Sequence, residues 1–147
     1  MSILIIDASV AVKWILPEPL RPLALRLRRS SSHQLYAPAF LDVELANVLW
    51  KNVRKGTIDR EEAGIRIGQL PEWRLTRHPD ASLVEAAFDL AARLDRTVYD
   101  CLYLALAVRL GGLMVTVDER FINSLTNTAW APFVIHLQDM PTTPDSP

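Results

Sequence analysis

Four acidic residues stand where apolar runs begin, end or are interrupted, and they constrain this chain more than any other feature. They are Asp7, Glu44, Asp100 and Asp118. Asp7 closes the apolar run 3–6, and Asp118 follows the apolar run 113–117. A carboxylate in a half-buried position is unfavourable unless a cation or several hydrogen-bond donors compensate it. Four such positions in one small chain predict a shared acidic pocket that binds divalent metal.

The pattern of apolar residues predicts strands alternating with helices. Segments 3–6 and 113–117 are short, continuous and largely β-branched, which is typical of strands buried on both faces. Further strands are expected at 35–37, 73–76 and 133–136, and helices at 7–16 (with Ser9 as cap), 19–32, 40–55, 59–70, 80–94, 98–110 and 119–126. Such alternation predicts a three-layer α/β/α sandwich around a parallel sheet, with ligands at the carboxyl ends of the strands.

Length and composition favour one domain in a reducing compartment. The chain has 147 residues, half of them hydrophobic, so we expect a single domain over 1–140 and a disordered tail over 141–147. No apolar run reaches the roughly 20 residues that span a bilayer, and no signal peptide is expected. The single cysteine, Cys101, excludes an internal disulfide and fits the cytoplasm.

Charge is balanced overall but unevenly distributed. The net charge is −1, from 16 basic and 17 acidic residues. Segment 13–55 holds eight basic residues against three acidic ones: Lys13, Arg21, Arg26, Arg28, Arg29, Lys51, Arg54 and Lys55 against Glu18, Asp42 and Glu44. A basic rim around an acidic centre suits a phosphodiester substrate with bridging metal. An ordinary solvated helix face explains any single arginine equally well.

Each acid also has a simpler explanation. Asp100 and Asp118 precede helices, where an N-cap or first-turn aspartate is common, and Asp7 could belong to a turn. Glu44 lies mid-helix, in a polar stripe with Asn47 and Lys51 that could be solvated or line a pocket. Mg²⁺ and Mn²⁺ prefer carboxylate oxygens, usually take one or two directly and keep several waters. The joint pattern therefore favours a site for one or two such ions.

Asp42 and Asp95 are not expected to belong to the metal pocket, and the histidines do not indicate zinc. On a helix, Asp42 points about 200° away from Glu44 and so cannot share its pocket. Asp95 is expected to lie in a solvent-exposed turn. The three histidines are scattered and lack zinc spacing: His33, His78 and His136. The tryptophans Trp14 and Trp50 are expected to pack, with stacking on bases as the alternative.

Four short blocks resemble a known family. They are Ile-Ile-Asp7-Ala-Ser9, Glu44-Leu-Ala-Asn47, Tyr99-Asp100-Cys-Leu-Tyr103 and Thr116-Val-Asp118. In this order and spacing they resemble the signature blocks of PIN-domain ribonucleases, and the chain length resembles that of VapC-type toxins of bacterial toxin–antitoxin pairs. The resemblance covers the chain to about His136.

The resemblance implies a PIN-like, five-stranded parallel sheet and Mg²⁺- or Mn²⁺-dependent cleavage of RNA. The acids at the four matching positions would form the metal pocket, supported by Ser9 and Thr116 and lined by Asn47. Water activated by metal would attack the phosphodiester and leave a 5′-phosphate and a 3′-hydroxyl. The family further implies a homodimer and a cognate antitoxin, which lays a segment, often with an arginine, across the acidic pocket.

Two other classes of protein remain open. Asp7 after the first strand is also typical of Asp-based phosphohydrolases and phosphoacceptor receiver domains. The phosphohydrolases require a second aspartate where this chain has Ser9, and receivers require a lysine after a late strand, where 116–118 has none. A catalytically silent binding module, whose acids only receive a partner's arginine, is the other alternative.

Overall fold

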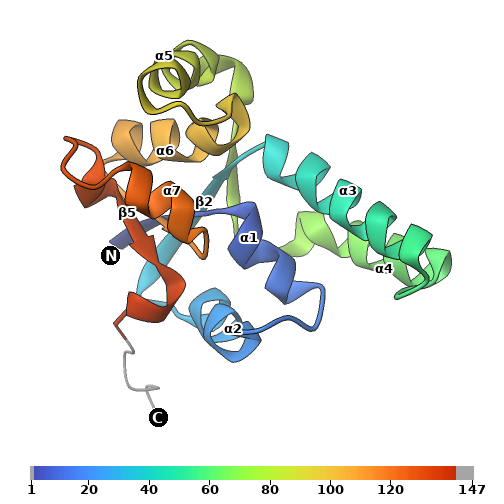
Figure 1. Ribbon diagram of the computed structural model, residues 1–147. Coiled ribbons are helices and arrows are strands. Elements are labelled where there is room, and N and C mark those ends of the chain that lie inside the picture. The colour runs from blue at the N-terminus through green and yellow to red at the C-terminus, as the bar shows by residue number, and fades with distance from the viewer. Residues whose placement is uncertain (1, 142–147) are drawn as a thin grey trace.

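A five-stranded parallel sheet forms the centre of the computed structural model, which describes residues 2–141 (Figure 1). The strands are β1 (Ser2–Ile6), β2 (His33–Pro38), β3 (Thr76–His78), β4 (Leu113–Thr116) and β5 (Val134–His136). Their order is β3-β2-β1-β4-β5, and all neighbouring pairs are parallel. The first strand of the chain therefore lies in the middle of the sheet, where the strand order reverses.

Helices cover both faces of the sheet, as the alternating pattern predicts. They are α1 (Ala8–Ala11), α2 (Arg21–Arg29), α3 (Phe40–Lys55), α4 (Arg60–Gln69), α5 (Val84–Leu94), α6 (Val98–Leu110) and α7 (Glu119–Ser124). Helix α6 packs against β1, β2 and β4 with α5 outside it, while α1 and α2 lie on the other face (Figure 1). The predicted α/β/α sandwich is confirmed.

Helix α6 is buried because it is apolar on every side. Residues 101–107 are all buried, and the helix covers the middle of the sheet. Its ends are set by local signals: the hydroxyl of Thr97 accepts a hydrogen bond from the backbone N–H of Asp100 at 3.1 Å, and Gly111 ends the helix with a φ of 63°. These caps place Asp100 in the first turn, at the edge of the core.

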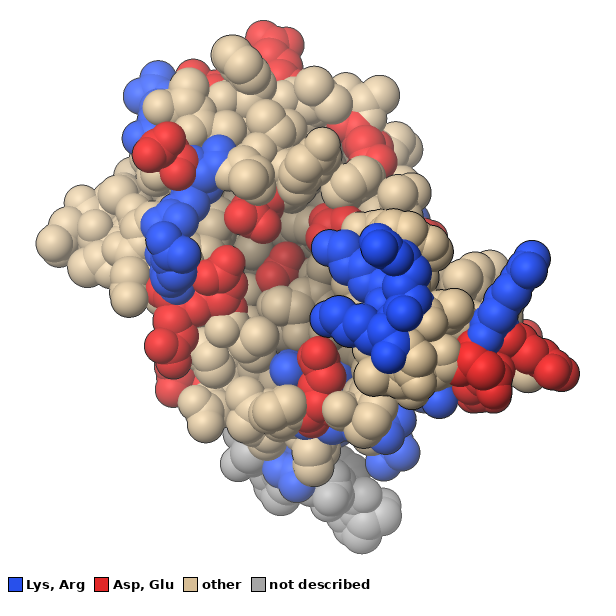
Figure 2. Space-filling model, turned by 45° about the vertical axis from the view of Figure 1, so that its right-hand side comes forward, with Lys and Arg blue, Asp and Glu red and all other residues tan. Residues whose placement is uncertain are grey.

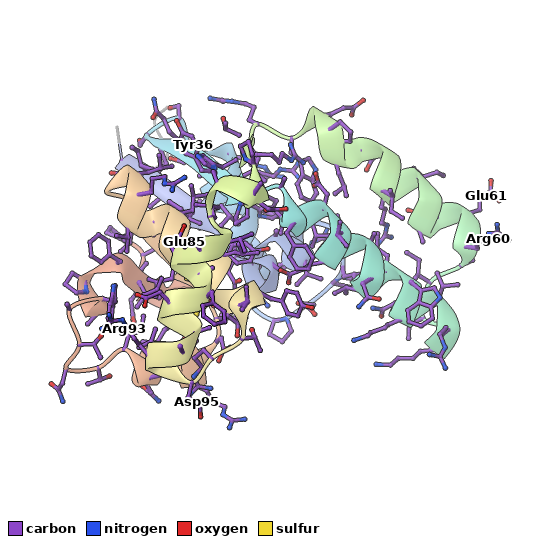
Figure 3. All side chains as sticks on the ribbon, turned by 90° about the horizontal axis from the view of Figure 1, so that it is seen from above. Tyr36, Arg60, Glu61, Glu85, Arg93 and Asp95 are labelled. Carbon is purple, nitrogen blue, oxygen red and sulfur yellow. The ribbon has the colours of Figure 1, made fainter. Side chains whose placement is uncertain are left out.

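Helix α3 turns one apolar stripe towards the core and extends away from it with α4. Its buried residues are Leu41, Leu45 and Leu49, spaced by four, and Gly56 ends it with a φ of 77°. Together α3 and α4 form an arm that projects from the sheet (Figure 1). Figure 2 shows a hollow beside this arm, with acidic side chains inside it and basic side chains on its margins. Figure 3 shows Arg60 and Glu61 at the tip of the arm.

Two sequence predictions of local structure were wrong. The helix expected at 7–16 begins at Ala8 with Asp7, not Ser9, at the N-cap position, and it tightens into the 3₁₀ helix η1 (Val12–Trp14). The strand expected at 73–76 starts only at Thr76, because Trp73 packs edge-to-face on Trp14 with ring centroids 5.0 Å apart. Tertiary packing thus overrides the local pattern at both places.

The other boundaries shift by a few residues, and the helix expected at 80–94 is divided into η3 (Asp80–Ser82) and α5. Further 3₁₀ turns are η2 (Leu70–Glu72), η4 (Ala131–Phe133) and η5 (Leu137–Asp139). No helix within residues 2–141 is long and apolar enough to cross a membrane. Apart from Pro141, the predicted tail lies outside the described residues.

The turn from α6 into β4 depends on close contact between two strands. Gly112 donates its backbone N–H to the carbonyl oxygen of Ala107 at 2.8 Å. A Cβ atom added at Gly112 would lie 2.8 Å from both the carbonyl oxygen and Cγ2 of Ile3. Because β4 pairs with β1, a side chain here would force the two central strands apart.

We expect Gly112→Ala to lower the free energy of unfolding by about 1–3 kcal/mol, through overpacking against β1. The matched control is Gly64→Ala: a Cβ there, inside helix α4, meets no atom within 4 Å. That substitution should raise stability by about 0.5–1 kcal/mol. Urea unfolding of both variants measures the difference, and equal stabilities would contradict the close approach of β1 and β4.

Candidate functional site

Four different elements carry the four acids to one end of the sheet. Asp7 follows β1 and occupies the N-cap position of α1, and Asp118 follows β4 and caps α7. Strands β1 and β4 are neighbours at the point where the strand order reverses, which is where ligands bind in open parallel sheets. Glu44 lies in the second turn of α3, and Asp100 lies in the first turn of α6.

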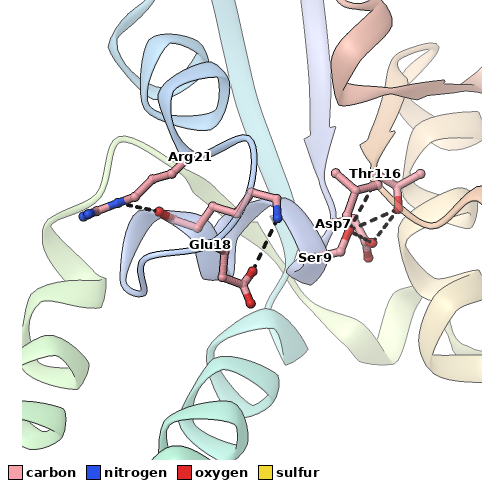
Figure 4. Close-up of polar contacts among 7 residues, drawn as sticks. Asp7, Ser9, Glu18, Arg21 and Thr116 are labelled. Carbon is pink, nitrogen blue, oxygen red and sulfur yellow. Dashed lines mark hydrogen bonds and ion pairs between the residues drawn. The ribbon is translucent and has the colours of Figure 1, made fainter. Parts of the chain in front are cut away.

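Asp7 is held by two hydroxyl groups. Its Oδ2 accepts hydrogen bonds from Ser9 Oγ at 2.6 Å and from Thr116 Oγ1 at 2.8 Å (Figure 4). The hydroxyls in turn accept backbone N–H groups at the end of β4, from Val117 to Ser9 at 3.2 Å and from Asp118 to Thr116 at 3.1 Å. This network fixes the position of Asp7 although its residue is only 7% exposed.

Glu44 is held by a buried tyrosine. The hydroxyl of Tyr103 donates to Glu44 Oε1 at 3.0 Å, and Tyr103 is 1% exposed. Burial raises the pKa of Glu44 to about 7, the hydrogen bond from Tyr103 opposes this, and the charges of Asp7 and Asp100 raise the pKa further. Without a nearby cation, this carboxyl group therefore holds its proton to a higher pH than an exposed glutamate does.

Asp100 and Asp118 stand at helix starts, in agreement with the simpler explanation of their positions. Asp118 Oδ1 accepts the backbone N–H of Phe121 at 3.0 Å, which caps α7 and leaves Oδ2 without a hydrogen bond from the described residues. Burial raises the pKa of Asp100, and so does the charge of Asp118, while Thr97 and the guanidinium of Arg96 oppose the rise. Asp118 can therefore cap α7 with one oxygen and still belong to the acidic site with the other.

Mutual repulsion connects all four carboxylates. Burial is also the main reason that the pKa of Asp7 is raised, and the charge of Asp100 raises it further against the hydrogen bonds from Ser9 and Thr116. Glu44 is affected by Asp7 and Asp100, and Asp100 by Asp118. Such a group favours a cation, because positive charge would relieve both the repulsion and the burial.

The carboxylates do not converge on one point. In the described part of the chain, no three His, Cys, Asp or Glu side chains are grouped closely enough to hold one metal ion together. Mg²⁺ usually takes only one or two protein carboxylates and completes its shell with water. The donor set therefore fits a hydrated Mg²⁺ or Mn²⁺ ion in its chemistry, which is all oxygen and all anionic.

Other predicted residues lie at the margin or away from the site. Asn47, expected to line the pocket, is exposed one turn beyond Glu44 and forms no side-chain hydrogen bond within residues 2–141. Asp42 points away and accepts a hydrogen bond from Arg77 Nη2 at 3.1 Å. Asp95 ends α5 in a left-handed conformation, as expected of a turn residue. Burial raises the pKa of the Cys101 thiol to about 11, which favours the neutral thiol over a thiolate nucleophile.

The two tryptophans differ in environment. Trp14 is 5% exposed, and its indole N–H donates to the carbonyl oxygen of Ala24 at 2.8 Å, so it packs as expected. Trp50 is 52% exposed on α3, with the guanidinium of Arg54 4.9 Å from its ring centroid. Trp50 therefore does not pack in the core of this chain, and packing at an interface or stacking on bases stays a prediction.

Sequence reasoning missed two residues beside the site. Tyr103 donates a hydrogen bond to Glu44, and Arg96 lies close enough to Asp100 for its charge to oppose the rise in the pKa of that acid. The spacing of Tyr103, three residues after Asp100, places both on one face of α6 and could have indicated a shared role. Arg96 carried no such signal, because its proximity depends on how the turn before α6 folds.

Comparison with known proteins identifies the family. The PIN domain family model matches residues 4–124. Ribonuclease VapC3 of Pyrobaculum aerophilum is 34% identical over 119 residues, which are 80% of this chain and 90% of that protein. Ribonuclease VapC12 of Mycobacterium tuberculosis is 32% identical over 122 residues, which are 82% of this chain and 91% of that protein. The chain belongs to the PIN domain family and is related to its VapC ribonucleases.

Solved structures share the fold. The crystal structure of PAE2754 from Pyrobaculum aerophilum superposes with a TM-score of 0.67 at 20% identity, covering 93% of this chain and 90% of that one. The structure of VapBC-1 from nontypeable Haemophilus influenzae gives a TM-score of 0.61 at 12% identity, covering 93% and 99%. The five-stranded arrangement is therefore the PIN-like one that the resemblance implied.

The raised pKa of Glu44 predicts how stability depends on pH. The folded protein binds this proton more tightly than the unfolded chain, so the free energy of unfolding falls as pH rises from about 4.5 to about 7. Without metal, the Tm should be several degrees lower at pH 8 than at pH 5, and Glu44→Gln should reduce this difference. The control is Glu61→Gln at the exposed tip of the arm (Figure 3), which should leave it unchanged. A Tm that rises with pH in the parent protein would contradict the burial of Glu44.

Proposed function

We propose that this protein is a metal-dependent endoribonuclease that hydrolyses RNA phosphodiester bonds. The observation that carries the proposal is the group of four mutually repelling carboxylates at the carboxyl end of the sheet. Its relatives named as ribonucleases support RNA as the substrate class. Basic side chains on the margins of the hollow suit a polyanion that crosses an acidic centre (Figure 2).

The proposed cofactor is Mg²⁺ or Mn²⁺, held by Asp7, Glu44, Asp100 and Asp118, some of them through water. A bound divalent ion would neutralise charge on the phosphate and lower the pKa of a water molecule. The protein's own part is orientation. Ser9 and Thr116 hold one oxygen of Asp7, Tyr103 holds one oxygen of Glu44, and each contact limits how far its carboxylate can turn.

We further propose that the protein acts as the toxin of a toxin–antitoxin pair in the cytoplasm. Its relatives carry the VapC name, and Cys101 is a buried free thiol, which suits a reducing compartment. The proposed antitoxin would place an arginine among the acids. A guanidinium there would relieve the same repulsion as a metal ion and would block the site.

A catalytically silent PIN-like module is the second candidate. The absence of three convergent ligands within the described residues favours it. In that case the acids would serve only to bind a partner's cation. Metal-dependent cleavage separates the two candidates.

Cleavage of total cellular RNA by the purified protein with Mg²⁺, Mn²⁺ or EDTA tests the nuclease proposal. We expect discrete metal-dependent products with 5′-phosphate and 3′-hydroxyl ends. Asp7→Asn and Asp100→Asn should each reduce the rate about 100-fold or more, because they remove negative charge from the proposed metal site. The Asp7 variant should nevertheless fold, and relief of repulsion should raise its Tm without metal.

The matched control is Asp42→Asn, which removes a carboxylate from the same region but one that pairs with Arg77. Its cleavage rate should stay within about twofold of the parent, since the carboxylate of Asp42 is bonded to Arg77 and lies outside the proposed metal site. Full metal-dependent activity of Asp100→Asn would overturn the assignment of the four acids. No cleavage by well-folded parent protein with any metal would favour the silent module.

We also propose that the chain forms a homodimer. Val84 and Phe88, one turn apart on α5, are 50% and 66% exposed, and such neighbouring apolar side chains often mark an interface. Light scattering after size exclusion should give the mass of two chains for the parent and of one chain for Phe88→Glu. Ile65→Glu, at a position on the arm that is 51% exposed, should remain dimeric. A monomeric parent would contradict the proposal.

A further inference from the structure

Lys13 is a buried lysine on the segment that also supplies Ser9 to the acidic site. It lies in η1 and is 6% exposed, and its ammonium pairs with Glu18 Oε1 at 3.4 Å. A buried ammonium group is unfavourable unless it is paired and hydrogen-bonded. The burial of this ammonium group therefore needs a compensating partner, which an exposed surface lysine would not need.

The pair with Glu18 uses little of the binding capacity of the ammonium. Three N–H groups are present, and within residues 2–141 the only side-chain hydrogen bond from Lys13 goes to Glu18. At 3.4 Å it is longer than the roughly 2.8 Å of a strong charge-assisted hydrogen bond. The side chain of Glu18 is 36% exposed, so solvent reaches this partner of the pair. An anion from solution could take its place.

The location of Lys13 connects it to the candidate site. Lys13 follows Ser9 by four residues, so the two side chains lie on one face of the α1–η1 segment. Ser9 is the residue that binds Asp7. Figure 4 shows the Asp7–Ser9–Thr116 network and the pair formed by Glu18 at the two ends of this segment. The segment that supplies Ser9 to the site therefore also carries Lys13.

The segment that carries Glu18 is stiff and separately anchored. Pro17 and Pro19 flank the glutamate and restrict its backbone. Arg21 donates its Nε to the carbonyl oxygen of Lys13 at 3.0 Å, and its backbone N–H to the carbonyl oxygen of Glu18 at 3.2 Å. The loop can therefore keep its shape when the Glu18 side chain turns away from the ammonium.

We infer that Lys13 binds a phosphate of the RNA strand next to the one that is cut, and that Glu18 is the counter-ion which this phosphate displaces. The inference rests on the proposed function for the identity of the polyanion. A phosphodiester offers two unesterified oxygens to the N–H groups that Glu18 leaves unused. Without RNA, Glu18 keeps the buried charge paired.

The test measures binding of a fluorescent single-stranded RNA oligonucleotide of mixed sequence in EDTA, by anisotropy over a salt series. Lys13→Met should weaken binding about fivefold to tenfold, through loss of a charge-assisted hydrogen bond. It should also reduce the slope of log K against log salt by about 0.7, the value for one phosphate contact of a single strand. Glu18→Gln should strengthen binding about twofold to fivefold, because it removes the competing carboxylate.

The double variant separates a phosphate site from a structural ion pair. If Glu18 acts by competing for Lys13, the gain from Glu18→Gln should vanish in the Lys13→Met background. A purely structural pair would lower the Tm of each single variant and leave RNA affinity and its salt slope unchanged. Arg93→Met and Asp89→Asn are the controls, since this pair is exposed and lies on α5, where Figure 3 labels Arg93.

The outcomes are distinct from those of the cleavage experiment, because no metal and no cleavage are involved. Weaker RNA binding by Glu18→Gln than by the parent would overturn the inference, and so would an unchanged salt slope for Lys13→Met. Absence of measurable RNA binding by every variant would overturn it as well. Lysine-dependent binding by a protein that cuts no RNA would support the contact between Lys13 and a phosphate, but it would overturn the nuclease proposal and the placement of that phosphate next to a cleaved one.

Discussion

The buried carboxylate of Asp7 is the constraint on which the rest of the site depends. It stands at the end of the central strand, where burial alone would favour its neutral form. Ser9 and Thr116 compensate by donating two hydrogen bonds, and they accept two backbone N–H groups from the end of β4. One network therefore anchors the first acid and also ties the ends of β1 and β4 together.

Repulsion among the acids connects the fold to its proposed chemistry. Four elements far apart in sequence bring their carboxylates together, and neighbouring charges add to the effect of burial in raising the pKa values of Asp7, Glu44 and Asp100. The apolar core around α6 and the sheet keeps these elements in place against the repulsion. A protein that holds like charges together in this way is preorganised for a cation, whether a metal ion or a partner's guanidinium.

Most elements could be predicted because their signals are local. Helix α3 spans the predicted residues because its apolar spacing and Gly56 agree, and α6 because an apolar helix can lie only in the core. Predictions failed where tertiary contacts decide. Trp73 packs on Trp14 and does not belong to the strand predicted there. The hydroxyl of Ser9, expected to cap a helix, instead donates to Asp7.

By itself the sequence determined the α/β class, the central buried strands and the four acids, because periodicity and a charge within an apolar run are both visible along one chain. Only the tertiary structure decided which residues meet. Tyr103 contacts Glu44 across 59 positions and Thr116 contacts Asp7 across 109. The burial of Lys13 likewise follows from the elements packed around it. Contacts between distant residues depend on how whole elements pack, and the local sequence pattern does not predict that packing.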